Sequence, residues 1–279
     1  MNAHAPTACG GTRPAGDAAP RILVAIPVFN EQRYVASVLS RVLAQTPEVL
    51  VIDDGSTDDT PLLLARQPVE VIRHAVNRGY GQSMIDAFRW ASCYGYDWLV
   101  TMDCDEQHEP ESLPDFFQAA ASGDCDVISG SRYLSAPDDG QHPPADRRAI
   151  NRTITTLVND CLGLRLTDAF CGFKAYRVRA LSRLELSERG YAFPLQFWVQ
   201  AAAQRLRIRE LPVRLIYNDP TRSFGGPLND ADRRLQHYLD VFEREKARFP
   251  DRFTPSAPCV AGRIDPHSPA AATTRARRR

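Results

Sequence analysis

The sequence predicts an α/β fold: a single domain with a mixed, mainly parallel sheet flanked by helices. Short runs of β-branched and other apolar residues alternate with helical patterns through the first half of the chain. The 279 residues, 43% of them hydrophobic, are enough to bury a sizeable core. Polar clusters follow the strand-like runs, which is where open α/β sheets bind their ligands.

The first half of the chain supplies strands and helices in alternation. Apolar runs predict strands at residues 22–29, 49–52, 69–73 and 98–102. Apolar residues at helical spacing predict helices at 34–43, 60–65 and 81–94, and Thr60 followed by Pro61 is typical of a helix start. Such alternation gives a mainly parallel sheet covered on both faces.

The second half is less regular. The same patterns predict strands at residues 126–129 and 211–217, and helices at 148–161, 192–204 and 230–248. Residues 134–146 contain three prolines and a glycine, so we expect a surface loop there. Residues 1–20 and 254–279 carry few large apolar residues and are predicted to be disordered, which leaves a folded domain at 21–253.

Composition excludes several classes of protein. Lys plus Arg and Asp plus Glu both number 34, so bulk charge indicates no nucleic-acid partner. The seven cysteines show no metal-ligand spacing, and neither a membrane span nor a signal peptide is evident. We therefore expect a soluble, cytoplasmic protein. The Arg-rich end (Arg275, Arg277, Arg278, Arg279) is either a solvated tail or a peripheral contact with the inner face of a membrane.

Asp103 and Asp105 are the sharpest chemical signal. They stand two residues apart at the end of the fourth predicted strand, where both can face one point. Two like charges held together are costly unless a cation neutralises them. Mg²⁺ or Mn²⁺, with diphosphate oxygens completing its shell, fits such carboxylates, and Gln107 supplies a further oxygen. The alternative is a solvated acidic turn.

Two further polar clusters follow predicted strands, and each is compatible either with a nucleotide-binding site or with a turn that has only a structural role. Asp53 and Asp54 follow the second strand, where one carboxylate could accept a base N–H and the other a ribose hydroxyl; an Asx turn or helix cap is the alternative. The segment from Asn77 to Gly81 suggests a dinucleotide loop. It follows the third strand and lacks the third glycine, so a Rossmann dehydrogenase is disfavoured.

Taken in order, these motifs resemble family 2 glycosyltransferases of the GT-A (Rossmann-like) fold, and within them the polyprenyl- or dolichyl-phosphate mannosyltransferase group. The resemblance spans about residues 22–224. It rests on PVFNE (27–31), DDGSTD (53–58), NRG (77–79), DCDEQHEP (103–110), GSRY (130–133) and DAFCGFKAY (168–176).

The resemblance implies a role for each matching residue. The donor nucleotide would be surrounded by Pro27, Asn30, Glu31, Asp53, Asp54, Asn77, Gly79 and Asp103. The metal would be held by Asp103, Asp105 and Gln107. Arg132 would face phosphate, and the acceptor loop would include Arg147, Arg148 and Asn151; solvated surface arginines are the alternative for the first two. Asp105, Arg132 and Asp168 are the expected catalytic residues.

The chain departs from the group at two places. Residues 218–226 replace the usual Gly-x-Ser-Lys segment, and we expect Arg222 and Ser223 to take over its phosphate contact. Gln196 stands where the group often has Glu. The first change leaves the identity of donor and acceptor open, and neither touches the predicted metal site.

The resemblance implies an inverting, metal-dependent transfer of a sugar, mannose from GDP-mannose, to a polyprenyl phosphate. A lipid monophosphate is already anionic, so no general base is then required. The alternative acceptor is a soluble hydroxyl on a glycan or natural product. That reaction needs a base, and Asp168 is the candidate, with a helix or turn cap as its other role. A catalytically silent nucleotide-sugar-binding protein is the remaining alternative.

Overall fold

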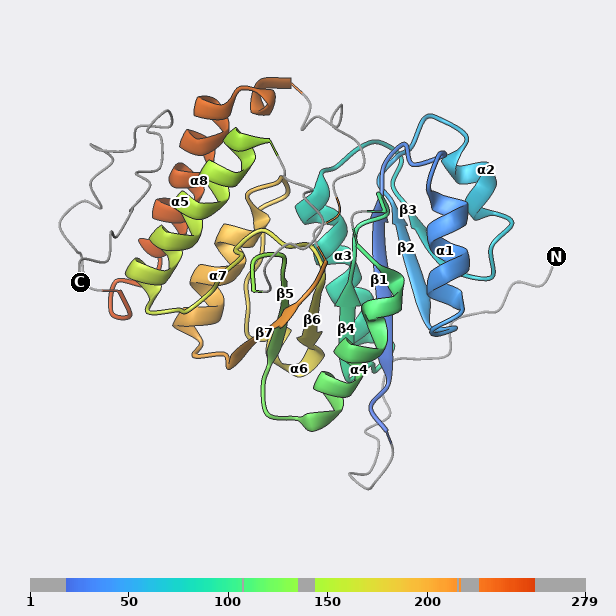
Figure 1. The fold of residues 1–279 in the computed structure, drawn as a ribbon, viewed down its shortest axis with the longest axis horizontal. Helices are drawn as coiled ribbons and strands as arrows, with labels where there is room; N and C mark the ends of the chain where they lie inside the picture. The colour runs from blue at the N-terminus through green and yellow to red at the C-terminus, as the bar shows by residue number, and fades with distance from the viewer. Residues whose placement is uncertain (1–18, 107, 135–143, 215, 217–225, 254–279) are drawn as a thin grey trace, which may run out of the picture.

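A seven-stranded sheet forms the centre of the molecule (Figure 1). The computed structural model describes residues 19–106, 108–134, 144–214, 216 and 226–253. The strand order is β3-β2-β1-β4-β6-β5-β7, and β6 alone among these strands runs antiparallel to its neighbours. The predicted mixed, mainly parallel sheet is therefore confirmed.

The strands and helices occupy the following residues. The strands are β1 (Ile22–Val28), β2 (Val49–Asp53), β3 (Glu70–Arg73), β4 (Trp98–Thr101), β5 (Val127–Ser131), β6 (Lys174–Arg177) and β7 (Ile208–Pro212). The α-helices are α1 (Val35–Leu43), α2 (Thr60–Leu64), α3 (Tyr80–Cys93), α4 (Leu113–Ser122), α5 (Ala145–Leu162), α6 (Val178–Leu181), α7 (Phe193–Ala203) and α8 (Ala231–Lys246). Two 3-10 turns, η1 (Pro110–Ser112) and η2 (Gly226–Asn229), precede α4 and α8.

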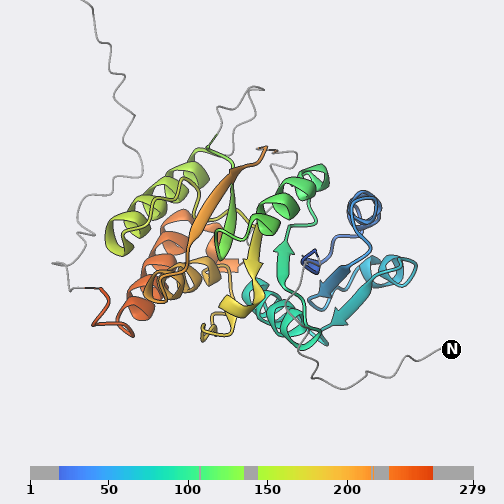
Figure 2. The ribbon, with the colours of Figure 1, turned by 90° about the horizontal axis from the view of Figure 1, so that it is seen from below.

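Alternation along the buried strands divides the core between the two faces of the sheet. Successive strand residues point to opposite faces, so Leu23 and Ala25 pack with α3, α5, α7 and α8, while Val24 and Ile26 pack with α1 and α4. Figure 2 shows α1 and α4 on one side of the sheet and α3 on the other. The first core extends beneath the paired helices α5 and α8.

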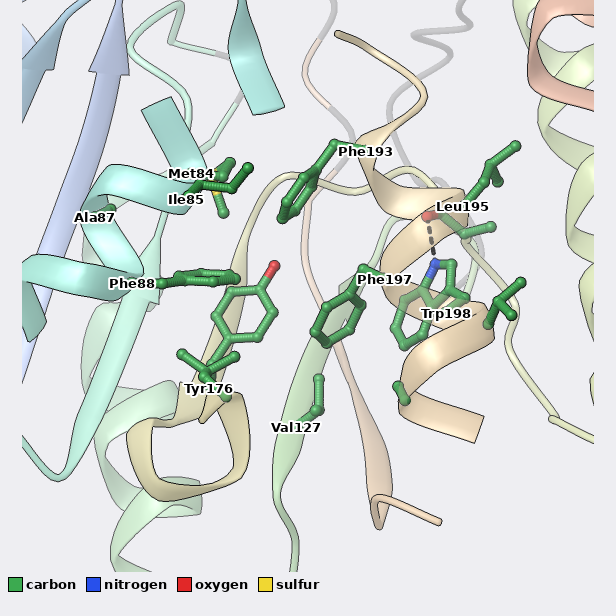
Figure 3. Packing of buried hydrophobic residues seen from close by; sticks show 14 of the residues in the cluster. Met84, Ile85, Ala87, Phe88, Val127, Tyr176, Phe193, Leu195, Phe197 and Trp198 are labelled. Carbon is green, nitrogen blue, oxygen red and sulfur yellow. Dashed lines mark hydrogen bonds between the residues drawn. The ribbon is translucent and has the colours of Figure 1, made fainter. Parts of the chain in front are cut away.

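Aromatic rings fill the core between α3, β6 and α7 (Figure 3). The Tyr176 ring centroid lies 5.0 Å from that of Phe88 and 5.1 Å from that of Phe197, both edge-to-face. The Trp198 indole N–H donates to the Ala169 carbonyl at 2.9 Å. Because Ala169 precedes β6 in a polar segment, this bond ties that segment to the rigid core.

The structure corrects the bounds of two expected elements and adds elements that were not predicted. The strand predicted at 211–217 is β7 at 208–212, because pairing with β5 fixes its position (Val127 opposite Ile208). The helix predicted at 148–161 begins at Ala145, inside the loop expected at 134–146. Strand β6 and helix α4 were not predicted. Strand β6 is only four residues long, and most of it lies in the motif of residues 168–176, which also contains charged residues.

Other expectations concern residues without a described position. The predicted disordered ends, including the arginine-rich tail, lie outside the described residues, apart from 19–20. Residues 135–143 of the predicted loop do so as well.

Among the residues that have described positions, no helix combines the length and the apolar character needed to cross a bilayer.

Candidate functional site

The direction of the strands gathers the polar clusters at one edge of the sheet. β1, β2, β3 and β4 are parallel, so the segments that follow them emerge together. β6 runs the other way, and its first residue Lys174 pairs with Thr101 at the end of β4. The antiparallel strand therefore brings the preceding segment, residues 168–173, to the same edge.

Asn30 joins the first two clusters. Its backbone is left-handed (φ 57°), a conformation that Asn tolerates better than most residues. The side-chain oxygen accepts from the Thr57 N–H at 2.8 Å, and the Asn30 N–H donates to Ser56 Oγ at 2.9 Å. Next to it, the N–H of buried Glu31 donates to Thr60 Oγ1 at 2.9 Å. Pro27, Asn30 and Glu31 thus lie against the segment that carries Asp53 and Asp54.

The two aspartates after β2 have different partners. Both Asp54 oxygens accept backbone N–H groups, Oδ1 from Arg78 and Oδ2 from Gly79, each at 2.8 Å. Asp53 Oδ1 accepts from Ser56 N–H at 2.9 Å, whereas its buried Oδ2 makes no hydrogen bond with any described residue and lies 3.3 Å from Arg73 Nε. Asp54 therefore holds the segment with Asn77 and Gly79, and Asp53 keeps an acceptor atom.

His74 is a residue of this cluster that sequence reasoning missed. It is buried at the end of β3, with Nδ1 2.6 Å from Asp54 Oδ1 and Nε2 3.1 Å from Asp86 Oδ2 on α3. Both ring nitrogens face carboxylate oxygens, which makes the imidazole a bridge between β2 and α3. A lone buried histidine gives no such signal in sequence, because Asp86 is twelve residues away.

Asp103 and Asp105 are half-buried where β4 ends. The Asp103 N–H donates to Nδ1 of buried His108 at 3.0 Å, and burial lowers the pKa of that imidazole. Gly172, just before β6, leaves room for the Asp103 carboxylate: a Cβ at Gly172 would lie 2.5 Å from Asp103 Oδ2. After Asp105, Glu106 turns the chain with a positive φ of 59°. His108 and Gly172 belong to motifs quoted in the sequence analysis, but no role was predicted for either residue.

Asp103 and Asp105 are suited to a divalent ion only in part. Among the residues with described positions, no group of three or more His, Cys, Asp or Glu side chains could hold a metal. Gln107, the third predicted ligand, lies outside the described residues. Asp103 and Asp105 supply two hard oxygen donors, which fits an ion whose remaining ligands come from water and a substrate such as a diphosphate.

Partly buried Arg132 and fully buried Asp168 form an ion pair on the other side of β6. Arg132 follows β5 and donates from Nε and Nη2 to Asp168 at 2.7 and 3.0 Å. Asn151 on α5 donates to the same carboxylate at 2.8 Å and accepts from Thr155. The planar guanidinium of Arg132 thus engages both carboxylate oxygens of Asp168, which is the strongest geometry for such a pair. Asn151 is thus part of the support of this pair.

The pair shifts both pKa values. Burial alone would raise the pKa of Asp168, but the charge of Arg132 and the hydrogen bonds from Arg132 and Asn151 hold it well below its usual range. Burial would lower the pKa of Arg132, and Asp168 raises it above the usual value. Asp168 is fully buried and ionised, which fits a carboxylate that positions Arg132 better than one that takes up a proton.

The remaining predicted acceptor residues form two pairs. Arg147, half-buried, and Arg148, exposed, lie in the first turn of α5. Burial raises the pKa of the Tyr133 phenol, and the charges of Arg132 and Arg148 oppose that rise; Arg132 Cζ lies 5.8 Å from the centroid of this ring. Arg222 and Ser223 lie outside the described residues.

Two further side chains at this edge were not predicted. Lys174 is buried, donates to the Cys171 carbonyl, and has its pKa lowered by burial. Tyr191 is 41% exposed and stacks on Tyr80 with ring centroids 6.2 Å apart. Burial and the charges of Asp103, Asp54 and Glu31 raise the pKa of Tyr191.

The fold and this edge define a GT-A glycosyltransferase. The model of the family described as "Glycosyl transferase family 2" matches residues 23–185, more than half of the chain. The chain therefore belongs to glycosyl transferase family 2 and is a glycosyltransferase, as the motifs predicted.

Relatives and solved structures extend this assignment. The chain is 32% identical over 223 residues to an undecaprenyl-phosphate mannosyltransferase from Micrococcus luteus, covering 76% of this chain and 90% of the relative. It is 31% identical over 204 residues to a polyprenol monophosphomannose synthase from Mycolicibacterium smegmatis, covering 69% and 76%. These two confirm the resemblance to the polyprenyl-phosphate mannosyltransferase group.

A solved structure with the same fold is glucosyl-3-phosphoglycerate synthase from M. tuberculosis, with a TM-score of 0.64, 18% identity and coverage of 82% and 81%. A structure of the enzyme from Mycobacterium tuberculosis with Mn²⁺ and UDP-glucose has a TM-score of 0.65, 18% identity and coverage of 85% for both chains. At this identity the likeness concerns the fold.

Proposed function

We propose that this enzyme transfers mannose from GDP-mannose to a polyprenyl phosphate, with inversion at the anomeric carbon and with the help of Mg²⁺ or Mn²⁺. The observation that carries the proposal is the placement of Asp103 and Asp105, which follow β4, at the same edge of the sheet as the Arg132–Asp168 pair. The names of the two mannosyltransferase relatives support the choice of sugar and lipid. The reaction would take place at the cytoplasmic face of the membrane.

The donor would lie over the ends of β1, β2 and β4. Pro27, Asn30 and Glu31 would flank the nucleotide, with Asp53 offering its remaining oxygen to an N–H of the base. Asp54 would act indirectly, since both of its oxygens hold the backbone of the segment with Asn77 and Gly79. That segment would border the donor.

Asp103 and Asp105, with Gln107, would hold the metal ion. When bound, such an ion neutralises the charge that develops on the departing nucleoside diphosphate. His108 would fix the backbone of Asp103 through its 3.0 Å hydrogen bond, and Gly172 would leave space for the carboxylate. Arg132 adds a fixed positive charge at the same edge, although Asp168 neutralises part of it.

Replacing Gly172 with Ala is expected to lower turnover about 10- to 100-fold, because the new methyl group must displace the Asp103 carboxylate from 2.5 Å. Binding of Mn²⁺, followed by calorimetry, should weaken as well. The unfolding midpoint in urea separates this effect from a general loss of stability. Wild-type metal affinity in a folded variant would contradict the role of Gly172.

The acceptor phosphate would lie near Arg132, Arg147 and Arg148. A phosphate monoester is already an anionic nucleophile near neutral pH, so the transfer needs no proton acceptor. Arg222 and Ser223 remain part of this proposal from the sequence. A soluble hydroxyl acceptor would need a base, and the buried, arginine-paired state of Asp168 disfavours that residue for the task.

The test is a panel of nucleotide sugars incubated with the enzyme and Mn²⁺, with and without polyprenyl phosphate, while nucleoside diphosphate release is measured. We expect release from GDP-mannose that depends on the lipid phosphate. Release that is unaffected by the lipid but stimulated by a soluble glycan would favour the hydroxyl acceptor. Binding of a donor without release under any of these conditions would favour the silent nucleotide-sugar-binding protein, and no binding of any donor would contradict both readings.

A further inference from the structure

A short segment, residues 187–190, lies between two regions that are far apart in sequence. On one side it is bonded to helices α7 and α8, and on the other it contacts the loop of residues 77–81, which leads into α3. The Gln82 N–H donates to the Arg189 carbonyl at 3.2 Å. The 187–190 segment thus connects the helical layer to the 77–81 loop.

Gln196 on α7 holds this segment. Its side-chain oxygen accepts from the N–H groups of Ser187 and Glu188, both at 2.7 Å. Its side-chain nitrogen donates to Ser187 Oγ at 3.2 Å and to Glu245 Oε2 on α8 at 2.9 Å. Gln196 and Glu245 are each 3% exposed, so the bonds form away from solvent.

The contact with the 77–81 loop leaves no space for adjustment. A Cβ at Gly79 would collide with the Arg189 carbonyl oxygen, and one at Gly81 with the Glu188 carbonyl oxygen. Gly79 also has a φ of 97°, which favours glycine for a separate reason. Backbone packed this closely transmits a displacement, because the two surfaces cannot slide apart without losing the Gln82 hydrogen bond.

We propose that Gln196 and Glu245 are positioning residues for donor binding: they fix the 187–190 segment, which in turn fixes the 77–81 loop against Asp54. The effect of the loop on the donor rests on the proposed function. The clamp, which consists of Gln196, Glu245 and the 187–190 segment packed on the 77–81 loop, does not depend on the proposed function. The side-chain hydrogen bonds of Gln196 within the described part of the chain run to Ser187, Glu188 and Glu245, so its influence on the donor site would pass through the backbone of Glu188 and Arg189.

The amide at position 196 is matched to the carboxylate at 245. An amide can accept two N–H groups and still donate to Glu245, whereas a glutamate could not donate when ionised. Gln196→Glu would therefore set two carboxylates about 2.9 Å apart in a buried site. The double variant Gln196→Glu with Glu245→Gln restores one donor and one acceptor at that contact.

Gln200 provides a matched control. Its side-chain nitrogen donates to Glu245 Oε1 at 2.7 Å, and it bonds the backbone of Glu185, not the 187–190 segment. Gln200→Glu thus brings the same charge against the same glutamate. We expect both single variants to lose similar amounts of global stability in urea, but only Gln196→Glu to disturb the 77–81 loop.

Hydrogen–deuterium exchange of peptides covering residues 77–83 is the first measurement. Exchange should become at least about fivefold faster in Gln196→Glu, stay near wild type in Gln200→Glu, and return toward wild type in the double variant. Equal exchange in the two single variants, or none that differs from wild type, would overturn the clamp.

Binding of GDP-mannose and of UDP-glucose in the presence of Mn²⁺ is the second measurement. For whichever probe the wild type binds, Gln196→Glu should raise Kd about tenfold and Gln200→Glu should leave it within about twofold. If the wild type binds neither probe, the proposed function is contradicted. The difference in hydrogen exchange between Gln196→Glu and Gln200→Glu still tests whether Gln196 fixes the 77–81 loop. Equal Kd changes in both variants would overturn the positioning role.

Discussion

The Asp105→Asn variant is expected to lose at least about 100-fold in turnover, because one of two hard oxygen donors is replaced by a neutral amide. Asn keeps the size of the side chain, so the unfolding midpoint should change little. Relief of the repulsion between Asp103 and position 105 would, if anything, stabilise the apoprotein. Turnover at saturating Mn²⁺ and calorimetric Mn²⁺ binding are the measurements.

The neighbouring carboxylate supplies the control for charge. Glu106 is half-buried and accepts from Ser37 Oγ at 3.2 Å, away from Asp103. Glu106→Gln removes the same formal charge one residue further on, and it should keep turnover within about threefold of wild type. Equal losses of turnover in Glu106→Gln and Asp105→Asn would show that the total negative charge at this edge matters, and that the paired aspartates have no special role.

The Asp168→Asn variant is expected to lose about 2–4 kcal/mol of stability, because it leaves the partly buried Arg132 guanidinium without a counter-charge. Glu111→Gln breaks the exposed pair with Arg41 and should cost at most about 1 kcal/mol. Both values come from urea unfolding at pH 7. A loss below about 1 kcal/mol in Asp168→Asn would contradict the structural importance of the buried pair.

The pH dependence follows from the lowered pKa of Asp168. Its folded pKa lies below the unfolded value of about 3.9, so its contribution to stability is fully present above that value and is lost as pH falls through the folded pKa. The difference between wild type and Asp168→Asn should therefore stay constant from pH 5 to 8 and shrink in acid. An acid limb of kcat/KM above pH 5 that disappears in Asp168→Asn would instead identify Asp168 as a base.

Sequence reasoning could predict the half of the fold built from local signals. The strands β1 to β4 are apolar runs closed by polar residues, and the alternation with helices implies their common direction. β6 carries no such signal, because it has only four residues and two of them, Lys174 and Arg177, are charged. Its reversed direction depends on pairing with β4 and β5, which only the folded structure fixes.

The candidate site shows the same difference between local signals, which a sequence reveals, and long-range contacts, which it does not. Asp103 and Asp105 could be chosen because two carboxylates at a strand end have a chemical meaning by themselves. The partners of Asp54 and Asp168 could not, since Gly79 and Arg132 are 25 and 36 residues away. A carboxylate that binds a substrate and one that holds a loop have the same letter in a sequence. Burial and hydrogen-bond partners distinguish them.

The reversed strand β6 also bears on how the chain matures during synthesis. β1 to β4 make their pairings within the first 101 residues, so they can associate early. β5 has no parallel neighbour until β7, about 80 residues later, and no link to β4 until β6 is inserted between them. A nascent chain that ends before β6 would expose the edge of β4, a site for non-native pairing. Completion of the sheet and assembly of the catalytic edge would therefore be one event.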